Sequence, residues 1–136
     1  MGLYLTVFDG DDELDGVEMG SYADFAFFRD AVVSNVEGGT AGARCPTLIL
    51  HPDCDGEWMP VEAALLQTEL GEIAREFSKL PPVSLDGWKA EVAKMFGIKP
   101  NSLADCFFDV DGEPLLERLI GLAKLSQERK LPILFQ

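Results

Sequence analysis

The chain has 136 residues, a length that suits one domain, and 47% of them are hydrophobic, as in globular rather than disordered proteins. It carries 24 acidic and 11 basic side chains, and residues 1–68 alone hold 13 acidic and 2 basic ones. The net charge of −13 argues against direct binding of nucleic acid, whose phosphates require Lys and Arg, and favours a basic protein partner or a cation.

The sequence also predicts where the protein resides. No apolar run approaches the ~20 residues of a membrane helix, and the acidic N-terminus lacks the basic start of a signal peptide. Cys45, Cys54 and Cys106 form no C-x-x-C pair and indicate reduced thiols rather than a disulfide framework. We therefore expect a cytoplasmic protein without a membrane partner.

The first third of the chain predicts two strands and a helix. Residues 3–8 are a β-rich run, residues 9–13 are typical of a turn, and residues 14–19 fit an antiparallel return strand. Ser21 as N-cap and Asp24 three residues later form a capping box that begins a helix, which a glycine pair ends. Its apolar face comprises Phe25, Phe28, Val32 and Val36.

The middle third predicts a strand and a long helix. Residues 46–51 form a short apolar run that we assign to a strand, and residues 52–59 are assigned to a loop. Pro60 suits the first turn of a helix, and Pro81 and Pro82 lie beyond its end. The expected buried stripe comprises Leu66, Leu70, Ile73 and Phe77.

The last third predicts two helices and a terminal strand. A helix over 86–96 is expected to turn Trp88, Val92 and Met95 inward, while residues 103–110 are ambiguous between a short helix and a strand. A last helix begins at Pro114, and residues 131–135 form a strand with a proline at its start or on an edge. The inward face of the last helix comprises Leu115, Leu119, Leu122 and Ser126.

Apolar strands alternating with amphipathic helices predict the fold class. We expect a single α+β domain over residues 1–136, with a small mixed β-sheet covered by about four helices.

Two acidic segments share the pattern D-x-D-G-E, at residues 53–57 and 109–113. One interpretation is a repeated turn before a helix, since Asp and Gly favour turns and acids suit helix N-termini. The alternative is an irregular Mg²⁺ or Ca²⁺ site, because the Gly and Glu positions of an EF-hand are missing. If at least two of the apolar runs before Asp9, Asp53 and Asp109 are parallel strands, these acids should share one sheet edge.

The segment F-F-D-V-D-G at 107–112 resembles the first motif of haloacid-dehalogenase phosphatases, in which one Asp is the nucleophile and the next a general acid/base. Only 25 residues follow Asp111, and Glu113 replaces the motif's Thr. The sequence thus predicts no complete catalytic set and no cofactor or metal. The enzyme alternative is a small metal-dependent phosphoesterase or hydrolase that uses Asp9, Asp11, Asp53, Asp55, Asp109 and Asp111.

Two further residues each have a functional and a structural interpretation. The segment His51-Pro52-Asp53-Cys54 could supply zinc ligands, together with Cys45 or Cys106, but a hydrogen-bonded structural role fits a lone histidine better. Trp58 follows the acidic cluster and either packs under the next helix or is a partly exposed interface anchor.

Three stretches carry a family resemblance: M-G-L-Y-L at 1–5 leading to D-G-V-E at 15–18 and G-S-Y at 20–22, T-L-I-L-H-P-D-C-D-G-E-W at 47–58, and L-P-I-L-F at 131–135. Together they resemble the immunity proteins of bacterial polymorphic toxin systems, in the family called immunity protein seventy. The resemblance implies a small cytoplasmic protein that binds and blocks a cognate toxin.

The residues themselves fit such an inhibitor. Acidic side chains can occupy the positions that phosphates take in a basic nuclease, which makes a nuclease the favoured target. A scaffold or regulatory subunit is a third alternative. The expected toxin-facing residues are Asp11, Asp12, Glu13, Asp53, Asp55, Glu57 and Trp58.

Overall fold

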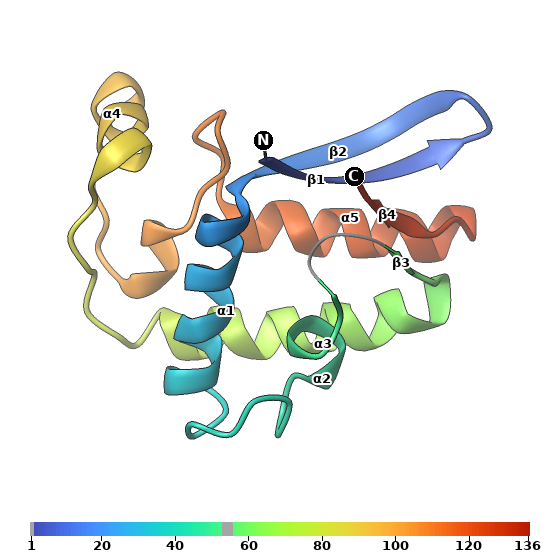
Figure 1. The fold of residues 1–136 in the computed structure, drawn as a ribbon. Helices are drawn as coiled ribbons and strands as arrows, with labels where there is room; N and C mark the ends of the chain where they lie inside the picture. Colours follow the sequence, from blue (N-terminus) through green and yellow to red (C-terminus); the bar gives the residue numbers. More distant parts are fainter. Residues whose placement is uncertain (1, 53–55) are drawn as a thin grey trace.

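A four-stranded sheet forms one side of the protein, and a computed structural model describes its residues 2–52 and 56–136 (Figure 1). The strand order is β2-β1-β4-β3, and all three pairings are antiparallel. The α+β prediction is confirmed, but the sheet is antiparallel rather than mixed. The strands are β1 (Gly2–Asp9), β2 (Asp12–Ser21), β3 (Glu57–Trp58) and β4 (Ile133–Phe135).

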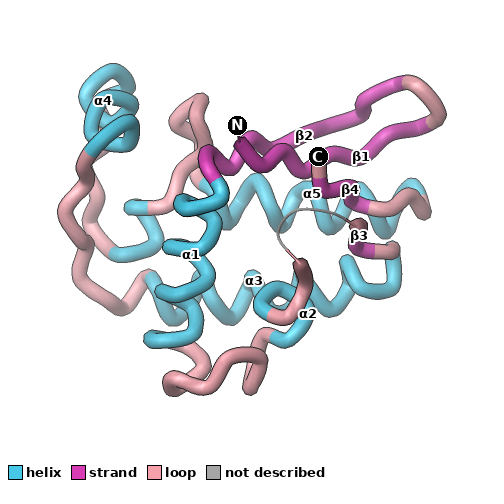
Figure 2. Tube along the Cα trace, in the orientation of Figure 1, coloured by secondary structure: helices cyan, strands magenta, loops and turns pink. Residues whose placement is uncertain are grey.

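The two ends of the described chain meet in this sheet. β1 and β2 form the expected hairpin, and the expected C-terminal strand lies between β1 and β3, with Leu5 opposite Phe135. Figure 2 shows the strands together along one side and the helices α3 and α5 on the other. The side chains that face these helices are buried, among them Leu3, Leu5, Val7, Val17 and Met19.

Helix α1 (Tyr22–Asn35) begins with the predicted capping box. The Ser21 hydroxyl accepts the Asp24 N–H at 3.1 Å, and the Asp24 carboxylate accepts the Ser21 N–H at 2.8 Å. Burial raises the pKa of Asp24, but hydrogen bonds from Ser21 and from the Trp88 indole outweigh it and lower the pKa overall. The Trp88 bond fastens helix α4 (Gly87–Phe96) to the start of α1.

The strand predicted at residues 46–51 is wrong, because the structure has a short helix there, α2 (Pro46–Ile49). Pro46 suits the first turn of a helix. The Glu69 carboxylate then accepts the N–H groups of Thr47 at 3.2 Å and Leu48 at 3.0 Å, two of the donors that a helix start leaves unpaired. A contact from a distant helix therefore overrides the β propensity of this run.

The two long helices pack against each other beneath the sheet. They are α3 (Pro60–Phe77) and α5 (Leu115–Arg129), and a hydrogen bond of 2.7 Å joins Gln127 to Gln67 between them. Both predicted inward faces are confirmed as buried: Leu66, Leu70, Ile73 and Phe77 on α3, and Leu115, Leu119, Leu122 and Ser126 on α5.

The buried side of helix α4 is not the side that the sequence predicted. Ala93 is its buried residue, while Met95 is 75% exposed rather than turned inward. The helix is held instead by Trp88, whose ring lies edge-on to Phe108 at 6.1 Å. The ambiguous segment after it forms a short 3-10 helix, η1 (Leu103–Cys106). Over the described ranges, no helix is both long and apolar enough to cross a membrane.

The loop between α1 and α2 is organised around one buried carboxylate. Glu37, 5% exposed, accepts N–H groups from Gly42 at 3.0 Å, Arg44 at 3.0 Å and Cys45 at 2.8 Å. Burial raises the pKa of Glu37, but these three backbone donors outweigh it and lower the pKa overall. Part of the acidic composition is therefore used inside the fold, since Glu37 and Glu69 both accept backbone N–H groups there.

Candidate functional site

The end of the β1–β2 hairpin carries the first predicted acidic cluster. Gly10 takes a positive φ of 62° at the turn, and Asp11, Asp12 and Glu13 are all exposed. Asp9 forms an ion pair with Arg129 at 3.0 Å, but among the described residues no ion pair involves Asp11, Asp12 or Glu13. No base of the described chain therefore neutralises these three charges, and Asp11 and Asp12 face solvent at the turn.

The sheet face turned away from α5 extends this acidic surface. Residues opposite each other in a sheet share a face, so Phe8 lies with Glu13, Tyr4 with Glu18, and Leu134 with Glu57. The three glutamates are exposed, and the Tyr4 and Phe8 rings are partly buried between them. We call Glu13, Glu18, Glu57, Tyr4 and Phe8 the open sheet face. Glu18, Tyr4 and Phe8 were not among the residues predicted from the sequence, although the alternation of Val17, Glu18 and Met19 along β2 marks this face.

The tyrosine of the open sheet face responds to the negative charge around it. Burial raises the pKa of Tyr4, and a hydrogen bond to Glu13 and the charges of Glu13, Glu18 and Asp15 raise it further. The acidic residues therefore create a local negative potential at this surface, although most of them are exposed.

The second predicted acidic cluster is only partly described. Asp53 and Asp55, like Cys54, lie outside the described residues, and Glu57 is exposed on β3. Trp58 is 1% exposed, and its indole N–H donates to the Thr47 carbonyl at 3.0 Å. Its ring therefore packs in the core, and an exposed Trp58 anchor is ruled out by this burial.

His51 adopts the structural role rather than that of a zinc ligand. Its Nδ1 lies 2.7 Å from the Pro52 carbonyl and its Nε2 lies 3.0 Å from the Glu57 carbonyl, while the ring stacks on Phe135 at 4.3 Å. Burial raises the pKa of the Cys45 thiol to about 11, which disfavours the thiolate that zinc requires. Within residues 2–52 and 56–136, no group of three or more His, Cys, Asp or Glu is placed to hold a metal.

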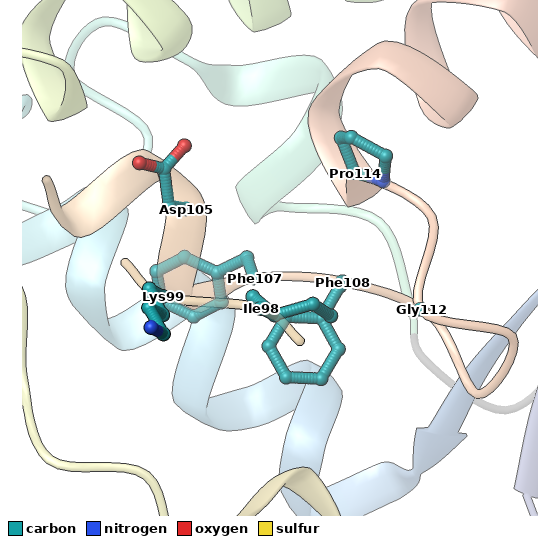
Figure 3. A pocket seen from close by; sticks show the side chains of 7 residues that line it. All are labelled: Ile98, Lys99, Asp105, Phe107, Phe108, Gly112 and Pro114. Carbon is teal, nitrogen blue, oxygen red and sulfur yellow. The ribbon is translucent and has the colours of Figure 1, made fainter. Parts of the chain in front are cut away.

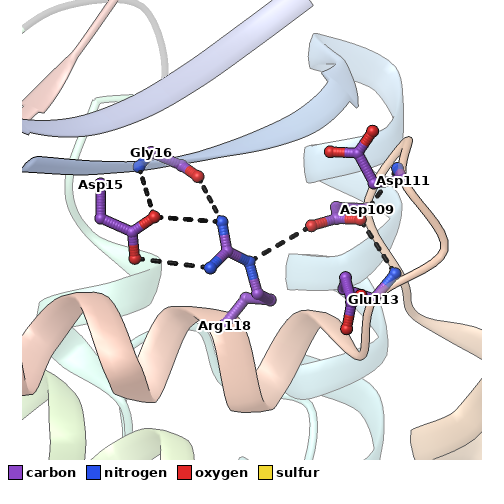
Figure 4. Close-up of polar contacts among 6 residues, drawn as sticks. All are labelled: Asp15, Gly16, Asp109, Asp111, Glu113 and Arg118. Carbon is purple, nitrogen blue, oxygen red and sulfur yellow. Dashed lines mark hydrogen bonds and ion pairs between the residues drawn. The ribbon is translucent and has the colours of Figure 1, made fainter. Parts of the chain in front are cut away.

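The phosphatase-like motif forms a structural turn (Figure 4). One oxygen of Asp109 accepts the N–H groups of Asp111 at 2.9 Å and Glu113 at 3.0 Å, and the other lies 3.5 Å from the Arg118 Nε. Asp109 is 1% exposed, and Arg118 also pairs with Asp15 at 3.3 Å. A carboxylate engaged in this way and closed to solvent is not available as a nucleophile.

The carboxylates of the hydrolase hypothesis are not gathered into one site. Asp9 pairs with Arg129 and Asp109 with Arg118, and these arginines are 11 positions apart on α5. That separation is about 16 Å along a helix at a rise of ~1.5 Å per residue. The prediction that these acids share one sheet edge required parallel strands, and the sheet is antiparallel. Asp9 and Asp109 therefore share neither a sheet edge nor a metal site.

A cavity of about 290 Å³ lies where the segment after α4 meets the start of α5 (Figure 3). It is lined by Ile98, Lys99, Asp105, Phe107, Phe108, Gly112 and Pro114. The lining is largely apolar, and the Asp105 carboxylate already accepts the Asn101 N–H at 3.0 Å. The lining residues thus offer no pairing of nucleophile and base.

A second cavity, of about 310 Å³, lies between α1 and the segment that leads into α4. Lys89 lines it, and its ammonium lies 4.8 Å from the centre of the Phe107 ring. Burial lowers the pKa of Lys89, while Asp24 acts in the opposite direction. The amine is held by aromatic rings and by the charge of Asp24 rather than by a catalytic partner.

Fold and surface together define a small α+β protein whose described acidic groups cap its own backbone, pair with its own bases or face solvent. The family of Immunity protein 70 matches residues 3–135, and the chain belongs to this family. Membership indicates an immunity protein directed against a toxin and points away from an enzyme. No curated protein and no solved structure matches the chain.

Proposed function

We propose that this immunity protein neutralises its cognate toxin by direct protein–protein contact through the end of the β1–β2 hairpin and the open sheet face. The observation that carries the proposal is the concentration of exposed carboxylates there, with Asp11, Asp12 and Glu13 outside every ion pair of the described chain. Family membership supplies the toxin as the partner.

Glu57 of the second acidic cluster lies close enough to the hairpin for one interface. Leu134 pairs with both Thr6 and Glu57, so Glu57 lies two strands from β1, about 10 Å across the sheet. A standard interface covers about 800 Å² on each partner, roughly 30 Å across, and can include the hairpin end as well as Glu57. Asp53 and Asp55 lie outside the described residues, and they stay in the proposal only as predicted from the sequence.

The chemistry of this surface favours a basic target. Exposed carboxylates steer a positively charged partner and raise its association rate more than they tighten the final complex. A nuclease domain fits, because acidic side chains can take the places of substrate phosphates on its basic surface. Tyr4 and Phe8, partly buried among the glutamates, supply the aromatic contact that interface centres favour.

The test is association kinetics with the purified cognate toxin domain, at two salt concentrations. Neutralising the hairpin end in the triple variant Asp11→Asn, Asp12→Asn, Glu13→Gln should lower the association rate constant about tenfold and flatten its salt dependence.

A matched control removes the same charge elsewhere. The variant Asp30→Asn, Glu113→Gln, Glu117→Gln changes three exposed acids on α1 and around the start of α5. It should leave the association rate constant within about twofold of the wild-type value. Equal rates for wild type and the hairpin variant, with the fold intact, would place the contact elsewhere.

A further inference from the structure

Helix α4 presents one side to solvent with a distinctive set of residues. Gly87, Ala90, Glu91, Lys94 and Met95 follow the spacing i, i+3, i+4, i+7, i+8 and line one shallow hollow. We call these five residues the α4 stripe. It combines two small residues, one acid, one base and a Met that is 75% exposed, and the pattern is compatible with a packed helix surface.

The other side of α4 holds the helix on the body. The Trp88 indole donates to Asp24 at 2.9 Å, and the Phe96 ring lies against Gly112, where an added Cβ would come within 2.8 Å of it. The α4 stripe therefore stays outward while α4 is fixed in place. Figure 1 shows α4 at the end of the molecule opposite the hairpin turn.

The charge around α4 differs from that of the rest of the chain. Residues 86–99 contain two acids and three lysines, a net charge of +1, whereas the whole chain carries −13. Two copies of so acidic a protein repel each other over most of their surfaces. The α4 stripe itself holds one acid and one base, so it adds no net charge to this repulsion.

We propose that the α4 stripe is the contact between two copies of this chain, paired antiparallel about a two-fold axis. With the axis level with the middle of the Val92–Ala93 peptide, Glu91 of each copy comes level with Lys94 of the other, so the ion pair forms twice. Met95 comes level with Ala90, and the small Gly87 and Ala90 allow the backbones to approach. Because the same residues of each copy pair with each other, the α4 stripe fits a second copy of this chain better than an unrelated partner.

The pairing goes beyond toxin binding and leaves that surface free. The hairpin end and α4 lie at opposite ends of each copy, so a dimer displays two separate acidic surfaces (Figure 1). A single ten-residue helix buries less than the roughly 1,200 Å² typical of stable complexes. The dimer is therefore weak and reversible.

Sedimentation velocity from about 5 µM to about 500 µM tests the pairing. Wild type should shift from monomer to dimer across this range. Met95→Lys should raise the dissociation constant at least tenfold, because it buries a charge in the contact. Val61→Lys is the matched control: Val61 is 73% exposed on α3, receives the same charge, and should leave the dissociation constant unchanged.

A charge exchange makes the test specific to the antiparallel register. Glu91→Lys should weaken the dimer at least tenfold by placing two lysines together, and adding Lys94→Glu should restore it. A protein that is monomeric at every concentration, or a double variant as weak as Glu91→Lys with an unchanged circular dichroism spectrum, would overturn the pairing. Loss of toxin binding in these variants while wild type stays monomeric would overturn it too, and would assign α4 to the toxin.

Discussion

Replacing Glu37 with Gln tests whether buried acids hold the fold together. The wild-type carboxylate accepts three backbone N–H groups with its two oxygens, and the side chain is 5% exposed. Gln keeps one oxygen, so at least one donor loses its acceptor and meets another N–H group. Hydrogen bonds to buried charged groups contribute about 1.5–3 kcal/mol each, so we expect Glu37→Gln to lower the unfolding free energy by about 3 kcal/mol at pH 7.

The same variant carries a pH signature of defined sign. The pKa of Glu37 is lowered from its ordinary value of 4.5, so folding favours the ionised form. Its contribution is therefore fully present above about pH 4.5 and is lost as pH falls through the lower folded value. Urea unfolding at pH 7 and about pH 3 should show the gap between wild type and Glu37→Gln narrowing at acidic pH. A gap below about 0.5 kcal/mol at pH 7, or one that stays constant with pH, would refute the reasoning.

Three further predictions follow from the packing and from the acidic turns. Trp58→Ala should lower the unfolding free energy by about 4 kcal/mol, measured by urea unfolding, whereas a change confined to toxin dissociation would contradict its burial. Asp109→Ala should lower the unfolding free energy, measured in the same way, by about 2 kcal/mol more than Asp109→Asn, because Asn can still accept the two N–H groups of the turn. Equal losses in the two variants would mean that Asp109 contributes only through its ion pair with Arg118. Adding Mg²⁺, Ca²⁺ or Zn²⁺ should barely change the melting temperature, whereas a specifically bound ion at a hundredfold excess over its Kd would raise the unfolding free energy by ~2.7 kcal/mol. A large rise in melting temperature that the double variant Asp53→Asn, Asp55→Asn abolishes would support the enzyme alternative.

Local signals in the sequence predicted the local parts of the fold. The capping box at Ser21 and Asp24 spans four residues, and the stripes of α3 and α5 repeat over several turns, so each is visible in a short window. The terminal strand was equally readable from its apolar run. Its place between β1 and β3 depends on how distant segments pair, which no short window records.

The errors arose where distant residues decide local structure. Residues 46–49 form a helix because Glu69, some twenty positions later, caps it. An acid within the apolar stripe of α3 was the available signal, since a charge at a core position requires partners. Likewise, the D-x-D-G-E turn resembled a catalytic motif because both use adjacent acids, and only the contact with Arg118 and the burial of Asp109 separate them.

The sequence predicted the negative charge of the hairpin end but not which side chains lie together on the open sheet face. The acids at Asp11, Asp12 and Glu13 stood out because no base interrupts them. The juxtaposition of Glu13 with Phe8 and of Glu18 with Tyr4 depends on the register of the hairpin, which contains two irregularities. A shift of one residue would turn these side chains toward the helices.

Titration of the purified toxin domain with this protein, followed by toxin activity and calorimetry together, tests the central claim most directly. Direct binding predicts a saturable heat and a loss of activity that end at the same ratio of one immunity protein per toxin, with both curves displaced alike by the triple hairpin variant. Protection of cells by a protein that leaves the purified toxin fully active and releases no heat of binding would contradict the account.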